Sequence, residues 1–482
     1  MLTLLLILLP IAAAVITLIS GDRLAKQIAL LGGLIELGLA IMVWTNFDPA
    51  GGSQFEFKYN WLASAGISFA AGIDGISLVL VLLTTFLTPL IILSAFGHDY
   101  KNSPTFYSLI LFMEAALVGV FTATDAFLFY LFFEAALIPV YFLAAVWGGE
   151  NRAKVTFKFF IYTIFGSLFM LVALVFLYYK TPGTHTSELT AFYNLQLDSQ
   201  AQGFLFWAFF IAFAIKMPLF PFHTWQPDTY TESPTQATML LSGIMLKMGV
   251  YGLIRLLLPI VPLGIETWGL LAVILSVIGI IYGSIIAIQQ RDMKRLVAYS
   301  SFAHVGLMSA GVFSSSANGL QGALIQMLAH GINVVGMFYV VDLIQSRTKT
   351  RYLDQLGGIS QTSPQFSVYF MILLLGSVAL PLTNGFVGEF LLLSSVFHYD
   401  AWLGAIAGLT IILGSVYMLR LYQRSMFGPK SNRVDGFADL TMSESAVLIP
   451  LVIMVFWIGI YPNTFLKISE PAVNQILHII SN

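Results

Sequence analysis

Long apolar segments follow one another along almost the whole chain, separated mostly by short polar connections. A helix needs about 20 apolar residues to cross a bilayer, and fourteen segments reach or approach this length. They are residues 2–20, 27–46, 72–95, 105–123, 125–147, 156–179, 203–222, 235–257, 265–288, 295–313, 317–345, 367–397, 402–424 and 445–468. The pattern predicts an all-α polytopic membrane protein with about fourteen transmembrane helices. The longest connections, around 47–71 and 180–202, are predicted to be loops on the same side.

The basic residues are distributed very unevenly over these connections. Sixteen of the 22 lysines and arginines lie in odd-numbered connections, and four lie on the opposite side. Positive residues collect in cytoplasmic loops, so the asymmetry predicts that both termini lie outside the cytoplasm. The first apolar segment has no basic region or cleavage site before it, and it is predicted to be a membrane helix and not a secretory signal.

Composition supports this class and excludes others. Only 10% of the 482 residues are charged, against about 25% in soluble domains. The 22 basic residues do not exceed the 24 acidic ones and form no patch, which excludes a nucleic-acid partner. The absence of cysteine excludes zinc–thiolate sites and cysteine-bound iron–sulfur clusters in this chain. Redox chemistry would therefore need other subunits.

The two remaining basic residues, Lys216 and Lys247, lie inside predicted spans. A lysine at the centre of a membrane helix costs roughly 2.5–3.5 kcal/mol on insertion scales. Lys247 is about twelve residues from either end of its span, too far for its side chain to reach an interface. Four further ionisable residues are predicted at similar depth: Glu134, His304, His330 and Glu389.

Prolines and glycines predict that two of the spans are broken. The seventh span has Pro218 and Pro221 directly after Lys216, and the twelfth has Gly376, Pro381, Gly385 and Gly388 before Glu389. Proline removes a helical hydrogen bond, and interrupted helices at membrane depth occur where they line a cavity. Paired interruptions are typical of inverted-repeat transporters.

The spacing of the charged residues favours such a repeat. Glu134 and Lys216 are 82 residues apart, and His304 and Glu389 are 85 apart. We therefore predict two inverted five-helix repeats with flanking helices. The predicted parts are 1–104, 105–257 (first repeat), 265–424 (second repeat) and 425–482.

The six intramembrane groups suit proton transfer better than metal binding. Histidine titrates near neutral pH, and a buried lysine can change its charge when a nearby carboxylate moves or gains a proton. Sodium and calcium need clustered oxygen ligands, so no metal site is predicted, and two histidines alone do not favour haem. The structural alternatives are packed histidines, a buried Glu–Lys pair and a glutamate that satisfies a broken helix. Glu36, Glu114 and Asp74 fit polar packing or interfacial roles.

Several motifs show a resemblance that covers nearly the whole chain. They are KMPLFPFHTWQPD at 216–228, SPT at 233–235, FEA at 133–135, LKMGVYG at 246–252, KRLVAYSS at 294–301 with His304, and GFVGEF at 385–390. Together they resemble the antiporter-like subunits of respiratory complex I. Multisubunit cation/proton antiporters and membrane-bound hydrogenases contain related subunits. The chain departs from the usual family pattern at Gln226 and at Thr229-Tyr230, which concerns loop contacts more than the channel.

The resemblance implies a function and a role for each residue. It implies a non-redox, proton-translocating subunit of NADH:quinone oxidoreductase, in which Glu134 and Lys216 form a coupled pair. Lys247 would be the central relay, His304 and His330 would continue the path, and Glu389 would end it. Glutamate at position 389 is similar to M-type subunits, whereas L- and N-type subunits and cation antiporters usually have lysine. NADH, FMN, iron–sulfur clusters and quinone would belong to partner subunits. The L- and N-type antiporter-like subunits would be further partners, in the membrane arm. A sodium/proton antiporter subunit and a scaffold that only packs the membrane arm are the alternatives.

Overall fold

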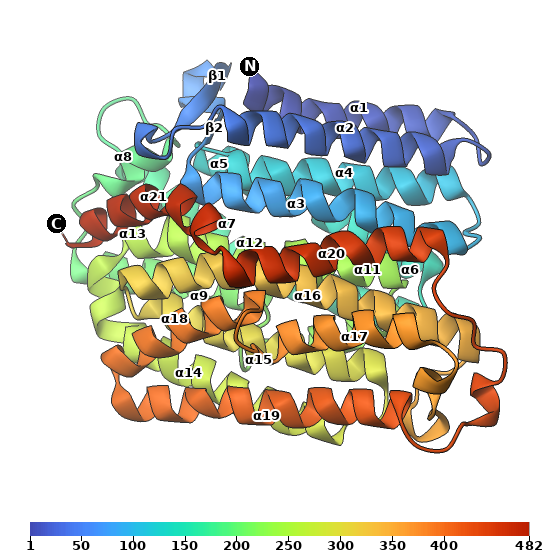
Figure 1. Ribbon diagram of the computed structural model, residues 1–482. Helices are drawn as coiled ribbons and strands as arrows, with labels where there is room; N and C mark the ends of the chain where they lie inside the picture. The colour runs from blue at the N-terminus through green and yellow to red at the C-terminus, as the bar shows by residue number, and fades with distance from the viewer. Residues whose placement is uncertain (482) are drawn as a thin grey trace.

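The computed structural model describes residues 1–481, most of them in long helices that lie side by side (Figure 1). The helices are α1 (Leu2–Ile19), α2 (Ala25–Thr45), α3 (Gly75–Ser94), α4 (Ser103–Thr122), α5 (Ala126–Ala135), α6 (Leu137–Trp147), α7 (Arg152–Lys180), α8 (Leu189–Tyr193), α9 (Ser199–Lys216), α10 (Trp225–Glu232), α11 (Thr235–Leu240), α12 (Lys247–Gly252), α13 (Leu258–Ile260), α14 (Pro262–Gln289), α15 (Met293–Phe313), α16 (Ala317–Thr348), α17 (Pro364–Ser377), α18 (Asn384–Tyr399), α19 (Ala401–Met426), α20 (Met442–Ile460) and α21 (Asn463–Ser481). Two π-helical segments, η4 (Leu241–Met245) and η5 (Leu253–Leu257), join α11, α12 and α13 into one helix over Thr235–Ile260.

The prediction of a helical, polytopic membrane protein is confirmed. Among the described residues, twelve helices are long and apolar enough to cross a membrane. The two remaining predicted spans, 203–222 and 367–397, are the two for which the sequence predicts an interrupted helix. The count of fourteen and the inverted repeat stay predictions.

Three helices form the interior of the bundle. In α16 the most apolar stretch is 100% buried, and in α15 and in the helix over Thr235–Ile260 it is 94% buried. By contrast, α1, α2 and α20 bury less than two fifths of theirs, and their exposed leucine, isoleucine and valine side chains suit a lipid or subunit contact. The interior helices carry Lys247, His304 and His330, so the fold places these groups far from lipid.

Residues 47–71, predicted as a loop, contain a β-hairpin instead. Strand β1 (Gln54–Leu62) pairs antiparallel with β2 (Ile67–Ile73), with Lys58 opposite Ala70. The sequence signal was the alternation of aromatic and polar residues from Phe55 to Asn60, a period of two. The turn uses Gly66 at φ 62°, where an added Cβ would lie 2.0 Å from the His185 carbonyl oxygen.

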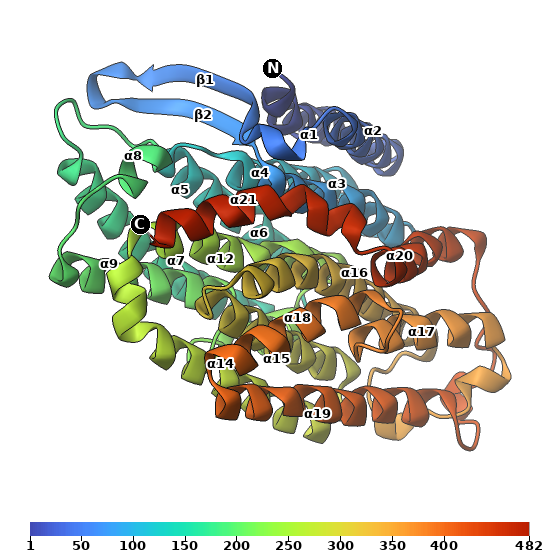
Figure 2. The ribbon, with the colours of Figure 1, turned by 60° about the vertical axis from the view of Figure 1, so that its left-hand side comes forward.

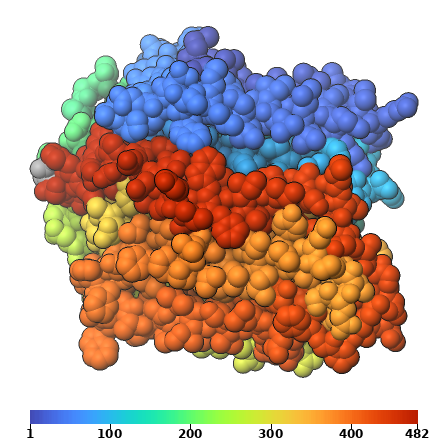
Figure 3. Space-filling view, in the orientation of Figure 1, coloured from blue at the N-terminus to red at the C-terminus, as the bar shows by residue number. Residues whose placement is uncertain are grey.

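The last predicted span, 445–468, is wrong at its C-terminal end. The helix α20 stops at Ile460, just before Tyr461-Pro462, and α21 starts at Asn463. Because Pro462 cannot continue a helix, the chain turns and α21 packs its buried residues, including Phe465 and Ile476, against the bundle. Figure 2 shows α21 crossing the outside of the molecule beside α3 and α16, and the two terminal helices form a band between the N-terminal helices and the region of α17–α19 in Figure 3.

Both predicted interruptions are confirmed, and a third appears. The helix α9 ends at Lys216 and α10 begins at Trp225, while α17 and α18 are separated by residues 378–383. The fifth span is also divided, at Ala136 between α5 and α6, two residues after Glu134. Pro139, which lacks an N–H group, explains this break, because the Ala135 carbonyl has no donor at position i+4.

The two ends of the bundle differ in character. The hairpin end carries β1 and β2, the start of α1 (Thr3 Oγ1 donates to the Phe55 carbonyl at 2.6 Å) and most of α21 (Figure 1). The opposite, basic end carries the connections that hold most lysines and arginines.

We expect the basic end to face the cytoplasm, since positive residues are retained there. A reporter that fluoresces only in the cytoplasm, fused after the last residue, should stay dark, whereas the same reporter placed in the 428–436 connection should be bright. A bright C-terminal fusion would contradict this orientation.

Candidate proton-translocation site

Lys247 lies in the middle of a buried row of ionisable side chains. Its Nζ donates to the Ser242 carbonyl at 2.6 Å and lies 2.9 Å from His330 Nδ1. The π-helical segment η4 directly precedes Lys247, and such insertions are frequent at functional sites. The side chain is fully buried. When Lys247 is protonated, its ammonium group can only donate. His330 Nδ1 is then the acceptor, and the neutral imidazole carries its proton on Nε2.

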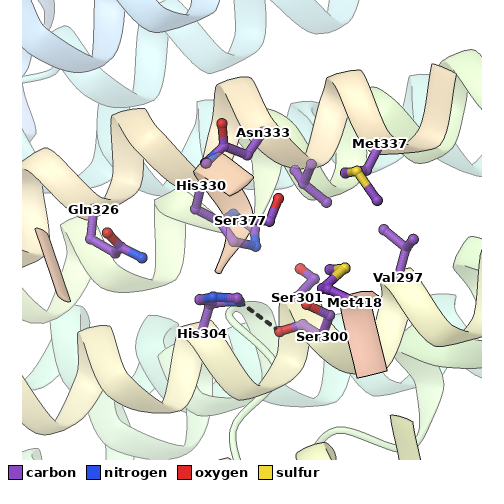
Figure 4. Close-up of a pocket in the computed structure, with 12 residues that line it drawn as sticks. Val297, Ser300, Ser301, His304, Gln326, His330, Asn333, Met337, Ser377 and Met418 are labelled. Atoms are coloured by element: carbon purple, nitrogen blue, oxygen red, sulfur yellow. Dashed lines mark hydrogen bonds between the residues drawn. The ribbon is translucent and has the colours of Figure 1, made fainter. Parts of the chain in front are cut away.

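The row of ionisable side chains continues from His330 to His304 and Glu389. The two imidazole centroids are 5.8 Å apart, and both rings line a cavity of about 20 Å³ (Figure 4). A cavity of this size holds about one water molecule. His330 Nε2 has no hydrogen-bond partner among the described residues, so its proton is available to the cavity.

The contact between His304 and Glu389 requires a shared proton. His304 Nδ1 lies 3.0 Å from the Ser300 carbonyl oxygen, which can only accept, so Nδ1 carries a proton (Figure 4). On the other side of the ring, Nε2 lies 3.1 Å from Glu389 Oε1. A hydrogen bond there needs one proton, held either by the imidazole or by the carboxyl group. The pair therefore forms a natural storage place for a single proton.

The broken helix α17–α18 brings Glu389 to this position. Ala379 and Leu382 have φ values of 56° and 74°, a region that bulky residues rarely adopt. The side chains of Asn333 and Asn384 exchange two hydrogen bonds, of 3.0 and 3.1 Å, which tie the start of α18 to α16. At Gly388 an added Cβ would lie 2.9 Å from the backbone Cα of Gln326, so glycine allows α18 to approach α16 this closely.

Lys216 is buried at the end of α9, next to an aromatic ring. Its Nζ lies 4.4 Å from the centroid of Phe133, a cation–π distance. No ion pair or hydrogen bond joins Lys216 to Glu134 in residues 1–481, although Glu134 is close enough for its charge to act on Lys216 through space. Glu134 is only half-buried. The predicted coupled pair is thus separated in this structure, with Phe133 beside the ammonium group.

Lys216 and Lys247 belong to helices that cross closely. An added Cβ at Gly249 would lie 2.6 Å from Met217 Cβ and 2.8 Å from the Phe213 carbonyl oxygen. This approach brings the end of α9 against α12, so the two lysines stand on adjacent helices at one crossing. Four of the six predicted residues, Lys247, His330, His304 and Glu389, therefore form one chain of contacts. Lys216 lies beside this chain, and the half-buried Glu134 lies nearer the outer face.

Sequence reasoning missed the groups that hold this arrangement. Asp228 pairs with Lys158 at 3.0 Å and Arg295 at 3.1 Å, which fixes the broken segment α10 between α7 and α15. The Trp225 indole donates to the Ile215 carbonyl at 2.9 Å, which satisfies a group freed by the interruption. Asp228 and Trp225 both lie in the KMPLFPFHTWQPD motif, which was the available signal.

The role of Glu36 and Glu114 as polar packing or interfacial groups stays a prediction. Both are fully buried, and none of their four carboxyl oxygens has a hydrogen-bond partner within residues 1–481. Asp74 differs, since it caps α3 by accepting from the Ile76 and Ser77 N–H groups and pairs with Arg255.

Comparison with known proteins identifies the family of the chain. The model of a family described as "NADH:quinone oxidoreductase/Mrp antiporter, TM" matches residues 123–414, and that of "NADH-ubiquinone oxidoreductase chain 4, amino terminus" matches residues 1–122. The chain therefore belongs to the NADH:quinone oxidoreductase/Mrp antiporter family. A relative called NADH-quinone oxidoreductase subunit M, from Rickettsia prowazekii (strain Madrid E), is 40% identical over 95% of this chain and 93% of its own.

Solved structures extend the comparison to the fold. A chain of respiratory complex I from Thermus thermophilus is 30% identical and superposes with a TM-score of 0.93 over 100% of both chains. A chain of the Mrp complex from Dietzia sp. DQ12-45-1b, at 19% identity, has a TM-score of 0.86 over 100% of this chain and 99% of its own, and shows a shared fold alone. The prediction of an antiporter-like membrane subunit of NADH:quinone oxidoreductase, which is an enzyme complex of several subunits, is confirmed. The Mrp-type antiporter is a structural relative.

Proposed function

We propose that this chain moves protons across the membrane through Lys216, Lys247, His330, His304 and Glu389, under the control of Glu134. The redox steps would take place in partner subunits that hold NADH, FMN, iron–sulfur clusters and quinone, and L- and N-type antiporter-like subunits would be neighbours in the membrane arm. The membrane would be the bacterial inner membrane, with both termini periplasmic. One observation carries the proposal: four ionisable groups form a buried chain of contacts from Lys247 to Glu389.

Each contact in this chain permits a proton step. Lys247 Nζ can give a proton to His330 Nδ1, and His330 can then release the proton on Nε2 into the small cavity. One water there can bridge the two imidazoles, since the centroids are 5.8 Å apart. The proton is then held between His304 and Glu389 and leaves from the carboxyl group.

Glu134 is placed to act as an electrostatic input. It is half-buried on α5, beside the helix break at Ala136. Its charge acts on Lys216 without direct contact, so a change in the surroundings of Glu134 alters how strongly Lys216 holds its proton. A change of charge on Lys216 then acts on Lys247 across the Met217–Gly249 crossing.

A polar cavity of about 760 Å³ at the basic end provides an entrance. It is lined by residues that include His98, Thr235, Lys294, Asp342 and Arg351. Thr235, the first residue of the helix that carries Lys247, donates to Asp342 at 2.7 Å. His98 Nε2 lies 2.7 Å from the same carboxylate, and this hydrogen bond raises the pKa of His98.

We expect Glu134→Gln and Lys216→Ala each to reduce NADH-driven proton uptake by inverted vesicles at least about fivefold, roughly 1 kcal/mol of lost coupling. Glutamine cannot change its charge, and alanine removes the group on which Glu134 acts. Glu134→Asp keeps the charge and should retain most of the uptake. Oxidation of NADH with an artificial electron acceptor, which bypasses the membrane arm, should stay normal in assembled complexes. Wild-type uptake in Glu134→Gln would contradict the input role.

A further inference from the structure

A second polar cavity lies at the hairpin end, away from the His304–Glu389 exit. It has a volume of about 360 Å³, and its exposed rim includes Ser53, Asn194 and Gln475. Its inner wall is formed by Asp74, Ser77, Tyr193, Tyr251 and Arg255. Asp74 and Arg255 are the only charged side chains among the described residues that line it.

The inner wall leads directly to the central lysine. Lys247, Tyr251 and Arg255 follow one another at intervals of four residues on one helix. Side chains at this spacing share a face of the helix, about 6 Å apart, and the Arg255 Nε donates to the Tyr251 hydroxyl at 3.3 Å. Arg255 therefore lies about two helical turns from the fully buried Lys247, and Tyr251, which also lines the cavity, lies about one turn from it.

Arg255 is fixed across this short route by contacts from several elements. Its guanidinium pairs with Asp74 at the start of α3 and donates to Ser77 Oγ at 3.3 Å. The same group lies 5.5 Å from the centroid of the Tyr251 ring. Its backbone carbonyl accepts from the Tyr193 hydroxyl at 2.8 Å, and the Tyr251 hydroxyl donates to the Phe121 carbonyl at 2.9 Å.

The chemistry of this cluster opposes proton passage. A guanidinium has five N–H donors, no acceptor, and does not lose its proton in proteins, so it cannot pass a proton on. Its permanent positive charge also repels protons, as charged side chains do in pores that exclude them. Asp74 also accepts from the N–H groups of Ile76 and Ser77 at the positive end of α3. The carboxylate is therefore held in place, and it keeps the guanidinium across the route.

We propose that the Asp74–Arg255 cluster is a proton barrier that closes a second route from Lys247 to the hairpin-end cavity. Protons that reach Lys247 are thereby directed to His330 and Glu389 and do not leak back through Tyr251. The inference rests on the proposed function of Lys247, but its test does not depend on pumping.

The test measures passive proton entry without NADH. The purified complex is reconstituted into vesicles with an internal pH dye, the membrane potential is clamped with valinomycin and potassium, and the outside is acidified. We expect Arg255→Gln to raise the rate of proton entry about tenfold over wild type, equivalent to lowering a barrier by about 1.4 kcal/mol. Asp74→Asn keeps the arginine and a side chain suited to capping α3, and it should remain as tight as wild type.

Two further variants make the result specific. Lys58→Gln removes a positive charge at the same end, from a largely exposed side chain paired with Glu188, and should not leak.

The double variant Asp74→Asn/Arg255→Gln leaves no unpaired carboxylate, which protects assembly, and should leak like Arg255→Gln. Wild-type tightness in this double variant would overturn the proposal. It would also be overturned if Arg255→Gln lost NADH-driven uptake without any passive entry, because Arg255 would then belong to an exit route. If the proposed role of Lys247 were wrong, the substitutions Lys247→Arg and Lys247→Met would instead leave NADH-driven proton uptake at the wild-type level.

Discussion

Replacing Lys247 by arginine is expected to abolish most proton pumping although the positive charge is retained. Lys247 donates to the Ser242 carbonyl and to His330 Nδ1, and in the proposed cycle it must release the second of these protons. Arginine holds its proton permanently, so the step to His330 would stop. We expect NADH-driven uptake to fall at least about tenfold, the effect of roughly 1.4 kcal/mol on the limiting barrier.

A matched substitution separates this effect from the larger size of arginine. Lys158 is partly exposed, pairs with Asp228 and stays charged in the proposed cycle, so Lys158→Arg should pump normally. Lys247→Met, which has similar bulk and no charge, should fail like Lys247→Arg. If the arginine variant pumped as well as wild type, Lys247 would be a fixed charge and the relay would have to be placed elsewhere.

The sequence predicted the ionisable groups of the site better than their contacts. Inserting a lysine or glutamate into the membrane within a span of about twenty apolar residues costs free energy. Lys216, Lys247 and Glu389 could therefore be identified as candidate site residues from the sequence alone. Their partners were not, because Lys247 Nζ donates to the backbone carbonyl of Ser242, which lies in a π-helical segment. A π-helical segment inserts one residue into a turn, and nothing in an apolar pattern marks where this occurs.

The same limit explains the errors in the fold. Hydropathy marks apolar length, and it therefore joined α20 to the start of α21 and passed over the break at Ala136. The β-hairpin was missed because its period of two is short and lies in a polar connection. Arg255 lies near the outer end of the predicted span 235–257, but its pairing with Asp74 could not be predicted, because Asp74 is about 180 residues away in the sequence, at the start of α3.

Glu389→Gln is expected to reduce pumping about fivefold or more while the broken helix remains intact. Glutamine can still accept or donate a hydrogen bond at His304 Nε2, so the 3.1 Å contact and the packing of α18 can persist. It cannot take up a proton, which removes the storage place between the two side chains. A glutamate that only satisfied the interrupted helix would tolerate this change.

The measurement is NADH-driven proton uptake per NADH oxidised, in vesicles that contain equal amounts of assembled complex. Glu389→Lys should retain part of the uptake, because the family resemblance implies that related subunits use lysine at this position. Asn384→Ala is the structural comparison, since it breaks the amide pair with Asn333 that ties the start of α18 to α16 and should lower thermal stability more than Glu389→Gln. Undiminished uptake in Glu389→Gln would show that the proton leaves His304 by another route, and that the shared proton of this pair is structural.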